Sequence, residues 1–134
     1  MSLCTVTEST WVELATDWDA FRKDPSHTSW STESGAVPAP TYSPALTALW
    51  GRLTTLASVE PFDWQSWGGL TRYAQGVGVL DAPVGEAVRL IVALQRAERM
   101  GEGTIGNAAE DGTIKAITKR LLGWHEQRVR DANA

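Results

Sequence analysis

Apolar side chains recur at helical spacing along most of this chain, and that periodicity constrains its fold more than any other feature. The longest example lies between Pro83 and Gly101, where apolar side chains follow one another every three or four residues: Val84, Val88, Ile91 and Leu94. This spacing places them on one face of an α-helix. Proline is tolerated in a first helical turn and glycine is common after a last one, so the pattern predicts a helix over 84–100.

The same argument predicts further helices on both sides of this segment. Apolar stripes bounded by capping residues, proline or glycine indicate helices over 7–21, 44–57 and 113–128. A shorter helix is expected after Asp63, where two glycines limit its length. The glycine-punctuated segment 101–106 is a candidate to restart as one more short helix, which would run through residue 110.

The remaining residues are expected to be loops. Residues 24–44 have no periodicity and are rich in Ser, Thr and Pro, which indicates a long loop, either irregular throughout or partly extended. Residues 77–80 are a candidate for a short extended piece. We therefore expect an all-α fold with five or six helices, in which a long Ser/Thr/Pro-rich loop follows the first helix. One compact domain would cover 1–134, with frayed ends at 1–6 and 129–134.

Composition excludes several classes of protein. The longest strictly apolar run, Leu90–Leu94, is far shorter than the roughly 20 residues that a membrane-spanning helix needs. Cys4 is the single cysteine, so neither an internal disulfide nor a thiolate metal cluster can form, as is typical of a cytoplasmic protein. With 12 basic and 16 acidic residues, the formal net charge of −4 argues against nucleic acid as the partner.

Tryptophan is the outlying residue type, with 7 Trp against 2 Phe and 2 Tyr. Four of them fall on predicted helical stripes and are expected in the core: Trp11, Trp18, Trp50 and Trp124. The other three lie in the Ser/Thr-rich loop or beside glycines: Trp30, Trp64 and Trp67. Large aromatic side chains serve both cores and binding surfaces, so these three either pack against the protein or contact a ligand.

The sequence contains no evident catalytic or metal-binding set. Cys4 has no histidine at a spacing that fixes a nucleophilic pair, and His27 and His125 are far apart, so both histidines are expected to be structural or solvated. Glu98 and Glu102 are four residues apart, but the glycines around Glu102 disfavour a continuous helix on which the two carboxylates would share a cation. We therefore expect no metal and no cofactor, and the sequence favours a protein without enzymatic activity over an enzyme.

The densest group of charged residues lies at the end of the helix predicted over 84–100: Arg96, Glu98, Arg99 and Glu102. One interpretation is an ion-pair network that caps this helix and fixes the next turn, since cations also suit a helix C-terminus. The other is a clamp for a carboxylate or another anion, because paired guanidinium groups donate bidentate hydrogen bonds. In that second interpretation the candidate neighbours in the binding site are Asp63, Trp64 and Trp67. Charge alone leaves both interpretations open.

Five short motifs follow one another between residues 42 and 122: Tyr42-Ser43-Pro44, Phe62-Asp63-Trp64-x-x-Trp67, Arg96-Ala97-Glu98-Arg99-x-Gly101-Glu102-Gly103, Glu110-Asp111-Gly112-x-Ile114 and Lys119-Arg120-Leu121. Together they resemble DUF6508, a family of small bacterial proteins of unknown function. Met100 departs from the family pattern, which usually has an aromatic residue there, and the region before residue 40 matches poorly. The resemblance implies an α-helical fold and a bacterial intracellular setting, and it implies no activity.

Two hypotheses for the function follow. The first is a non-enzymatic helical module that binds a protein partner or self-associates, which the missing catalytic set and the surplus of aromatic residues favour. The second is a small-molecule-binding or enzymatic site, which requires six side chains to converge on one concave pocket: Arg96, Glu98, Arg99, Glu102, Trp64 and Trp67. Both hypotheses depend on whether the three tryptophans outside the helical stripes are exposed to solvent.

Overall fold

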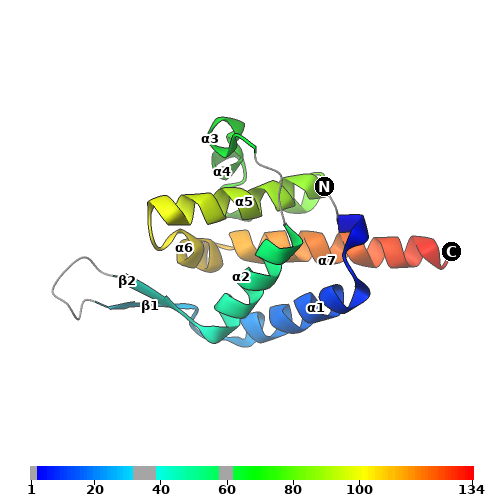
Figure 1. Ribbon diagram of the computed structural model, residues 1–134, viewed down its shortest axis with the longest axis horizontal. Helices are drawn as coiled ribbons and strands as arrows, with labels where there is room; N and C mark the ends of the chain where they lie inside the picture. The colour runs from blue at the N-terminus through cyan, green and yellow to red at the C-terminus, as the bar shows by residue number, and fades with distance from the viewer. Residues whose placement is uncertain (1–2, 32–38, 58–61) are drawn as a thin grey trace.

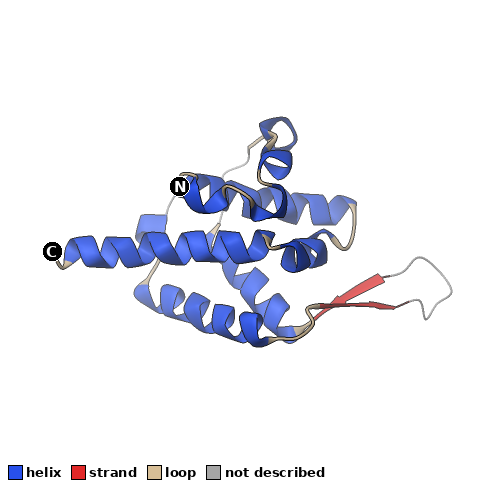
Figure 2. Ribbon diagram, turned by 180° about the vertical axis from the view of Figure 1, so that it is seen from behind, coloured by secondary structure: helices blue, strands red, loops and turns tan. Residues whose placement is uncertain are grey.

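The computed structural model describes residues 3–31, 39–57 and 62–134, and in this part the chain forms seven α-helices, three 3₁₀ turns and one β-hairpin (Figures 1 and 2). The α-helices are α1 (Glu8–Lys23), α2 (Pro44–Leu56), α3 (Trp64–Trp67), α4 (Gly69–Arg72), α5 (Val84–Met100), α6 (Thr104–Asp111) and α7 (Thr113–Ala132). The other elements are strands β1 (Thr28–Ser31) and β2 (Ala39–Tyr42) and turns η1 (Leu3–Thr5), η2 (Ala74–Gly76) and η3 (Val79–Asp81). The prediction of an all-α fold is confirmed, with the small hairpin added to it.

The helices of the described part outnumber the five or six expected, because the short helix after Asp63 is divided in two. Gly68 has a φ of +74°, a left-handed conformation that ends α3 and begins α4. The extended piece expected over 77–80 is wrong, since Val79–Asp81 is a 3₁₀ turn. Helix α7 continues to Ala132, beyond its predicted end at residue 128.

A hairpin lies within 24–44, the segment predicted to be a long loop. Its antiparallel register pairs Thr28 with Tyr42 and continues through Trp30, so these three side chains share one face. That face packs on α6, where a Cβ on Gly106 would come within 2.6 Å of the Thr28 hydroxyl and 3.1 Å of the Tyr42 ring. Ser, Thr and Pro give no alternating apolar pattern, which explains why the sequence does not indicate these strands.

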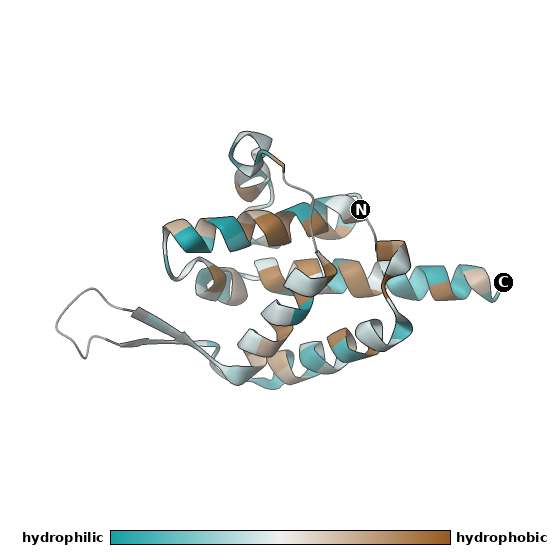
Figure 3. Cartoon of the chain, in the orientation of Figure 1, coloured by the Kyte–Doolittle hydropathy of each residue, from teal (hydrophilic) through white to brown (hydrophobic). Residues whose placement is uncertain are grey.

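Helix α5 occupies the centre of the fold, where other helices cover it on several sides. It packs against α2, α3, α4, α6 and α7 (Figure 1). All of Leu90–Leu94 is buried, which would not occur in a helix with a single apolar stripe. The strictly apolar run thus marks the helix that the others surround, and Figure 3 shows apolar residues gathered where α2, α5 and α7 meet. Even so, no helix of the described part has the length and apolar character to cross a membrane.

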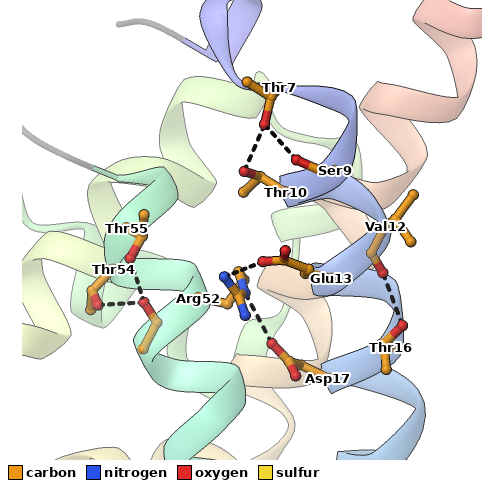
Figure 4. A network of polar contacts seen from close by, with 11 residues as sticks. Thr7, Ser9, Thr10, Val12, Glu13, Thr16, Asp17, Arg52, Thr54 and Thr55 are labelled. Carbon is orange, nitrogen blue, oxygen red and sulfur yellow. Dashed lines mark hydrogen bonds and ion pairs between the residues drawn. The ribbon is translucent and has the colours of Figure 1, made fainter.

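An ion-pair cluster joins α1 to α2 (Figure 4). The Arg52 guanidinium on α2 contacts two carboxylates one turn apart on α1, with its Nη1 2.5 Å from Glu13 Oε2 and its Nε donating to Asp17 Oδ2 at 3.1 Å. Two carboxylates at this spacing repel each other, and the shared guanidinium offsets that repulsion. The contact fixes the two helices that the hairpin connects.

The burial of the tryptophans largely agrees with the prediction from the helical stripes. The four expected in the core are buried or partly buried against it: Trp11, Trp18, Trp50 and Trp124. Of the other three, Trp67 also packs against the core and Trp64 is half-buried, whereas Trp30 is 51% exposed. Trp30 is therefore the tryptophan whose ring is most available to a ligand or partner.

The close packing of the hairpin on α6 can be tested with one methyl group. Alanine normally stabilises a helix interior relative to glycine by about 1 kcal/mol. Gly106→Ala should instead lower the free energy of unfolding by about 1–3 kcal/mol, because the added Cβ overlaps Thr28 and Tyr42. Gly123→Ala is the matched control, since a Cβ at that position in α7 meets nothing within 4 Å and should stabilise the protein. Urea unfolding measures both, and stabilisation by both substitutions would contradict this packing.

Candidate functional site

The Glu98 carboxylate, in the last turns of α5, joins three elements of the fold. Its Oε2 accepts a hydrogen bond from the Tyr42 hydroxyl of β2 at 2.8 Å, and its Oε1 accepts one from the Ile105 amide at 2.9 Å. Ile105 is in the first turn of α6, where backbone amides have no partner within the helix and the helix dipole favours a negative charge. Glu98 therefore fixes the turn between α5 and α6 and attaches the hairpin to it.

Burial and the Glu98 carboxylate together raise the pKa of Tyr42 to about 12, with burial as the larger cause. The Tyr42 hydroxyl thus keeps its proton at neutral pH and continues to donate it to Glu98. Because both oxygens of Glu98 already accept hydrogen bonds, this carboxylate is committed to holding the turn.

The indole of Trp30 lies on the same turn. A Cβ on Gly103 would come within 2.6 Å of the indole Cη2, and Gly103 has a φ of +100°, so both the close approach and the backbone conformation require glycine. The turn therefore supports the indole from below, while about half of Trp30 remains exposed to solvent.

The other charged residues of the predicted cluster lie on the outside of this turn. Arg96, Arg99 and Glu102 are exposed, and none makes a hydrogen bond or ion pair with another described residue. Met100, which is 73% exposed, follows the two arginines at a spacing that places all three on one face of α5. We call the set Trp30, Arg96, Arg99, Met100 and Glu102 the corner surface. The ion-pair network that the sequence suggests is thus absent from the described residues. The turn is held instead by Glu98 and by the Thr104 hydroxyl, which donates to the Gly101 carbonyl oxygen at 2.8 Å.

The remaining candidates, Asp63, Trp64 and Trp67, belong to α3 and its N-terminus. Asp63 caps this helix, accepting a hydrogen bond from the Ser66 amide at 3.3 Å, and its hydrogen bonds with Ser66 lower the pKa of its carboxyl. The Trp67 ring packs on Gly69 and meets Phe62 edge-on at 5.7 Å. Among the described residues, no hydrogen bond, ion pair or ring contact joins these three residues to the Arg/Glu cluster. The candidate residues therefore form two groups.

The sequence analysis did not identify a second charged cluster, which forms around a single carboxylate in the first turn of α5. Glu86 accepts a hydrogen bond from the Tyr73 hydroxyl at 3.0 Å and lies 3.6 Å from a guanidinium nitrogen of both Arg72 and Arg89. The guanidinium of Arg89 also lies 5.7 Å from the centre of the Phe62 ring. These contacts attach α4 and the segment before α3 to α5. The spacing of Glu86 and Arg89, three residues apart on one helix, was the available signal.

The described residues contain no group of three or more His, Cys, Asp or Glu side chains placed to hold a metal ion. His27 stacks on Phe21 with ring centres 4.0 Å apart, and its Nε2 lies 3.0 Å from the Phe21 carbonyl oxygen. These contacts give His27 a place in the packing between α1 and the hairpin.

Fold and surface together define a small all-α domain with one packed hairpin and an exposed corner of aromatic, apolar and charged side chains. The chain belongs to the family of unknown function DUF6508, whose model matches residues 6–127. That match corrects the expectation of a poor fit before residue 40, since it includes α1 and the hairpin. No curated protein and no solved structure matches the chain.

The contact between Tyr42 and Glu98 can be measured by a double-mutant cycle. Tyr42→Phe removes the donor and Glu98→Ala removes the acceptor, and each should lower the free energy of unfolding by about 1–3 kcal/mol. Because the two side chains share one hydrogen bond, their effects should be non-additive by about 1 kcal/mol. Glu102→Ala, an exposed glutamate four residues from Glu98, should change stability by less than about 0.5 kcal/mol. Additive effects, or an equal cost at Glu102, would contradict the assigned role of Glu98.

The same contact predicts how stability depends on alkaline pH. The pKa of Tyr42 is about 12 in the folded protein against an ordinary 10.0, so the folded state keeps a proton that the unfolded state releases. The resulting stabilisation is fully present below pH 10 and is lost as the pH rises through 12. Urea unfolding from pH 9 to 11.5 should therefore show a steeper loss of stability in the wild type than in Tyr42→Phe. Parallel curves for the two proteins would show that Tyr42 has no raised pKa.

Proposed function

We propose that this chain is a non-enzymatic helical module that binds another protein through the corner surface. The observation that carries the proposal is the exposure of Trp30 on the turn that follows α5, together with two exposed arginines in the last turns of α5 that have no described partners. Tryptophan, methionine and arginine are enriched at the centres of protein interfaces, where a few such side chains supply most of the binding energy.

The support under Trp30 strengthens this argument. Binding normally costs free energy for ordering flexible side chains at an interface. The Trp30 indole already rests on Gly103, and Glu98 holds the underlying turn by two hydrogen bonds. The exposed ring is therefore held in place before any partner arrives.

The charges of the corner surface define the chemistry of the partner. Arg96 and Arg99 each present a guanidinium group that can bind a carboxylate with two hydrogen bonds. Met100, on the same helix face as the arginines, and Trp30, on the turn that follows, add exposed apolar area. We expect the partner to present an apolar side chain flanked by Asp or Glu. A second copy of the chain is one such possibility, which light scattering distinguishes from a different protein.

The alternative is a small-molecule-binding or enzymatic site at the Arg/Glu cluster flanked by tryptophans. Two contacts make it the weaker proposal: Glu98 uses both oxygens within the fold, and Trp67 packs against Phe62. A cytoplasmic, bacterial setting is also part of our proposal. It is supported by the single cysteine, Cys4, and by the resemblance of the motifs to bacterial proteins.

The proposal can be tested by affinity capture from a lysate of the source organism, together with light scattering of the purified protein. The charge variant is Arg96→Gln/Arg99→Gln, and its control is Lys115→Gln/Lys119→Gln, which removes the same charge from exposed positions of α7. The apolar variant is Met100→Gln, and its control is Val77→Gln, at a side chain that is 69% exposed. We expect the two corner variants to lose a partner, or a dimer, that both controls retain, with affinity reduced roughly tenfold or more.

Two results would overturn the proposal. One is a monomer for which all five proteins recover the same set of captured proteins. The other is an equal loss of the partner in the corner variants and in their controls, which would indicate an effect of general charge or polarity.

A further inference from the structure

A cleft at the opposite end of the molecule lies outside the corner surface. It has a volume of about 180 Å³ and is formed by η1, the start of α1 and the second half of α7, which lie together in Figure 1. The residues that line it are Leu3, Cys4, Val6, Trp11, Trp124, His125, Arg128, Val129 and Ala132. Ligand sites are typically concave, and this cleft combines apolar lining residues with the polar groups of Cys4, His125 and Arg128.

Aromatic rings stacked on one another form one wall of the cleft. The Trp11 ring lies 5.8 Å from the Trp124 ring and stacks on His125 with ring centres 4.6 Å apart and planes within 5°. The Nε2 of His125 lies 3.1 Å from Glu8 Oε2, so a carboxylate already compensates any charge on this imidazole. These contacts keep the aromatic wall rigid and leave it without an uncompensated charge.

Arg128 differs because its charge has no carboxylate partner among the described residues. Its guanidinium lies 4.9 Å from the centre of the Trp124 ring, and its Nη1 donates to Cys4 Sγ at 2.6 Å. A guanidinium has five N–H donors in a planar fork, and the contact with sulfur uses one of them. An uncompensated cation is thus held on an indole at an exposed position of the cleft.

We propose that this cleft binds a small monocarboxylate with an apolar body. The carboxylate would pair with Arg128, which supplies the charge complementarity and the planar donors that this group prefers. The apolar body would lie against Trp124 and Val129, two apolar lining side chains that remain at least partly exposed, where it displaces water from apolar surface. The proposal is independent of the protein-binding function assigned to the corner surface, since the two sites share no residue.

The test uses phenylacetate as the probe and phenylacetamide, its neutral analogue, as the matched control ligand. Binding is followed by NMR through the indole N–H signals of Trp11 and Trp124. It is followed independently through the rate at which N-ethylmaleimide alkylates Cys4, the single cysteine, which lines the cleft. We expect phenylacetate to shift both indole signals saturably and to slow the alkylation of Cys4. Phenylacetamide should bind roughly tenfold or more weakly, the order expected for losing a charge-assisted hydrogen bond.

Three variants assign the effect to Arg128. Arg128→Gln should weaken phenylacetate binding roughly tenfold or more. Arg130→Gln, at an exposed arginine on the same helix that donates to Gln127, should leave binding within about twofold. Arg128→Lys keeps the charge without the planar fork, and should bind more weakly than the wild type while still preferring phenylacetate to phenylacetamide.

The outcomes decide the proposal in either direction. Equal binding of the acid and the amide, unsaturable shifts, or an equal loss in Arg130→Gln would overturn it. If Arg128→Gln is too unstable to measure, Arg128→Lys decides, because a lysine variant without preference for the acid would rule out a carboxylate at this position.

Discussion

The Glu98 carboxylate accepts hydrogen bonds from β2 and from α6, and the arrangement of the corner surface depends on both. The Ile105 amide sets where α6 begins, and the Tyr42 hydroxyl brings the hairpin, with Trp30, onto the turn. With 3.6 residues in each helical turn, Arg96 and Arg99 point from α5 in other directions than Glu98. Glu98 is thus bonded within the fold, whereas the guanidinium groups of Arg96 and Arg99 are exposed and have no partner among the described residues.

The sequence predicted those parts of the fold that depend on local periodicity, and it missed those that depend on distant contacts. Helix α5 was predicted from its apolar spacing, and the buried run Leu90–Leu94 fits its central position. The hairpin was not predicted, because its strands are held by the close approach of Thr28 and Tyr42 to Gly106, far along the chain. Neither strand has the alternating apolar pattern from which a half-buried strand is usually recognised.

The candidate site shows the same division between local and distant information. Glu98 and Glu102 are chemically identical and belong to one charged motif, yet one is bonded to Tyr42 and Ile105 and the other is exposed. The hydroxyl of Tyr42, 56 residues away from Glu98, and the amide of Ile105 distinguish them. The sequence shows that these charged residues belong to one segment, whereas their division into an inner and an outer part required the structure.

Trp30 and Trp67 show why the number of tryptophans alone carries little functional information. Both indoles rest on a glycine, since a Cβ would come within 2.6 Å of Trp30 at Gly103 and would overlap the Trp67 ring at Gly69. Phe62 then covers Trp67 edge-on at 5.7 Å, whereas no aromatic ring of the described residues is placed against Trp30. Whether an indole is exposed thus depends on whether a side chain from a neighbouring element packs on its free face. The glycine on the other face restricts the movement of the ring. An indole that is rigid and uncovered loses little entropy on binding, and this combination, present at Trp30, supports an interaction function more strongly than the tryptophan content of the chain.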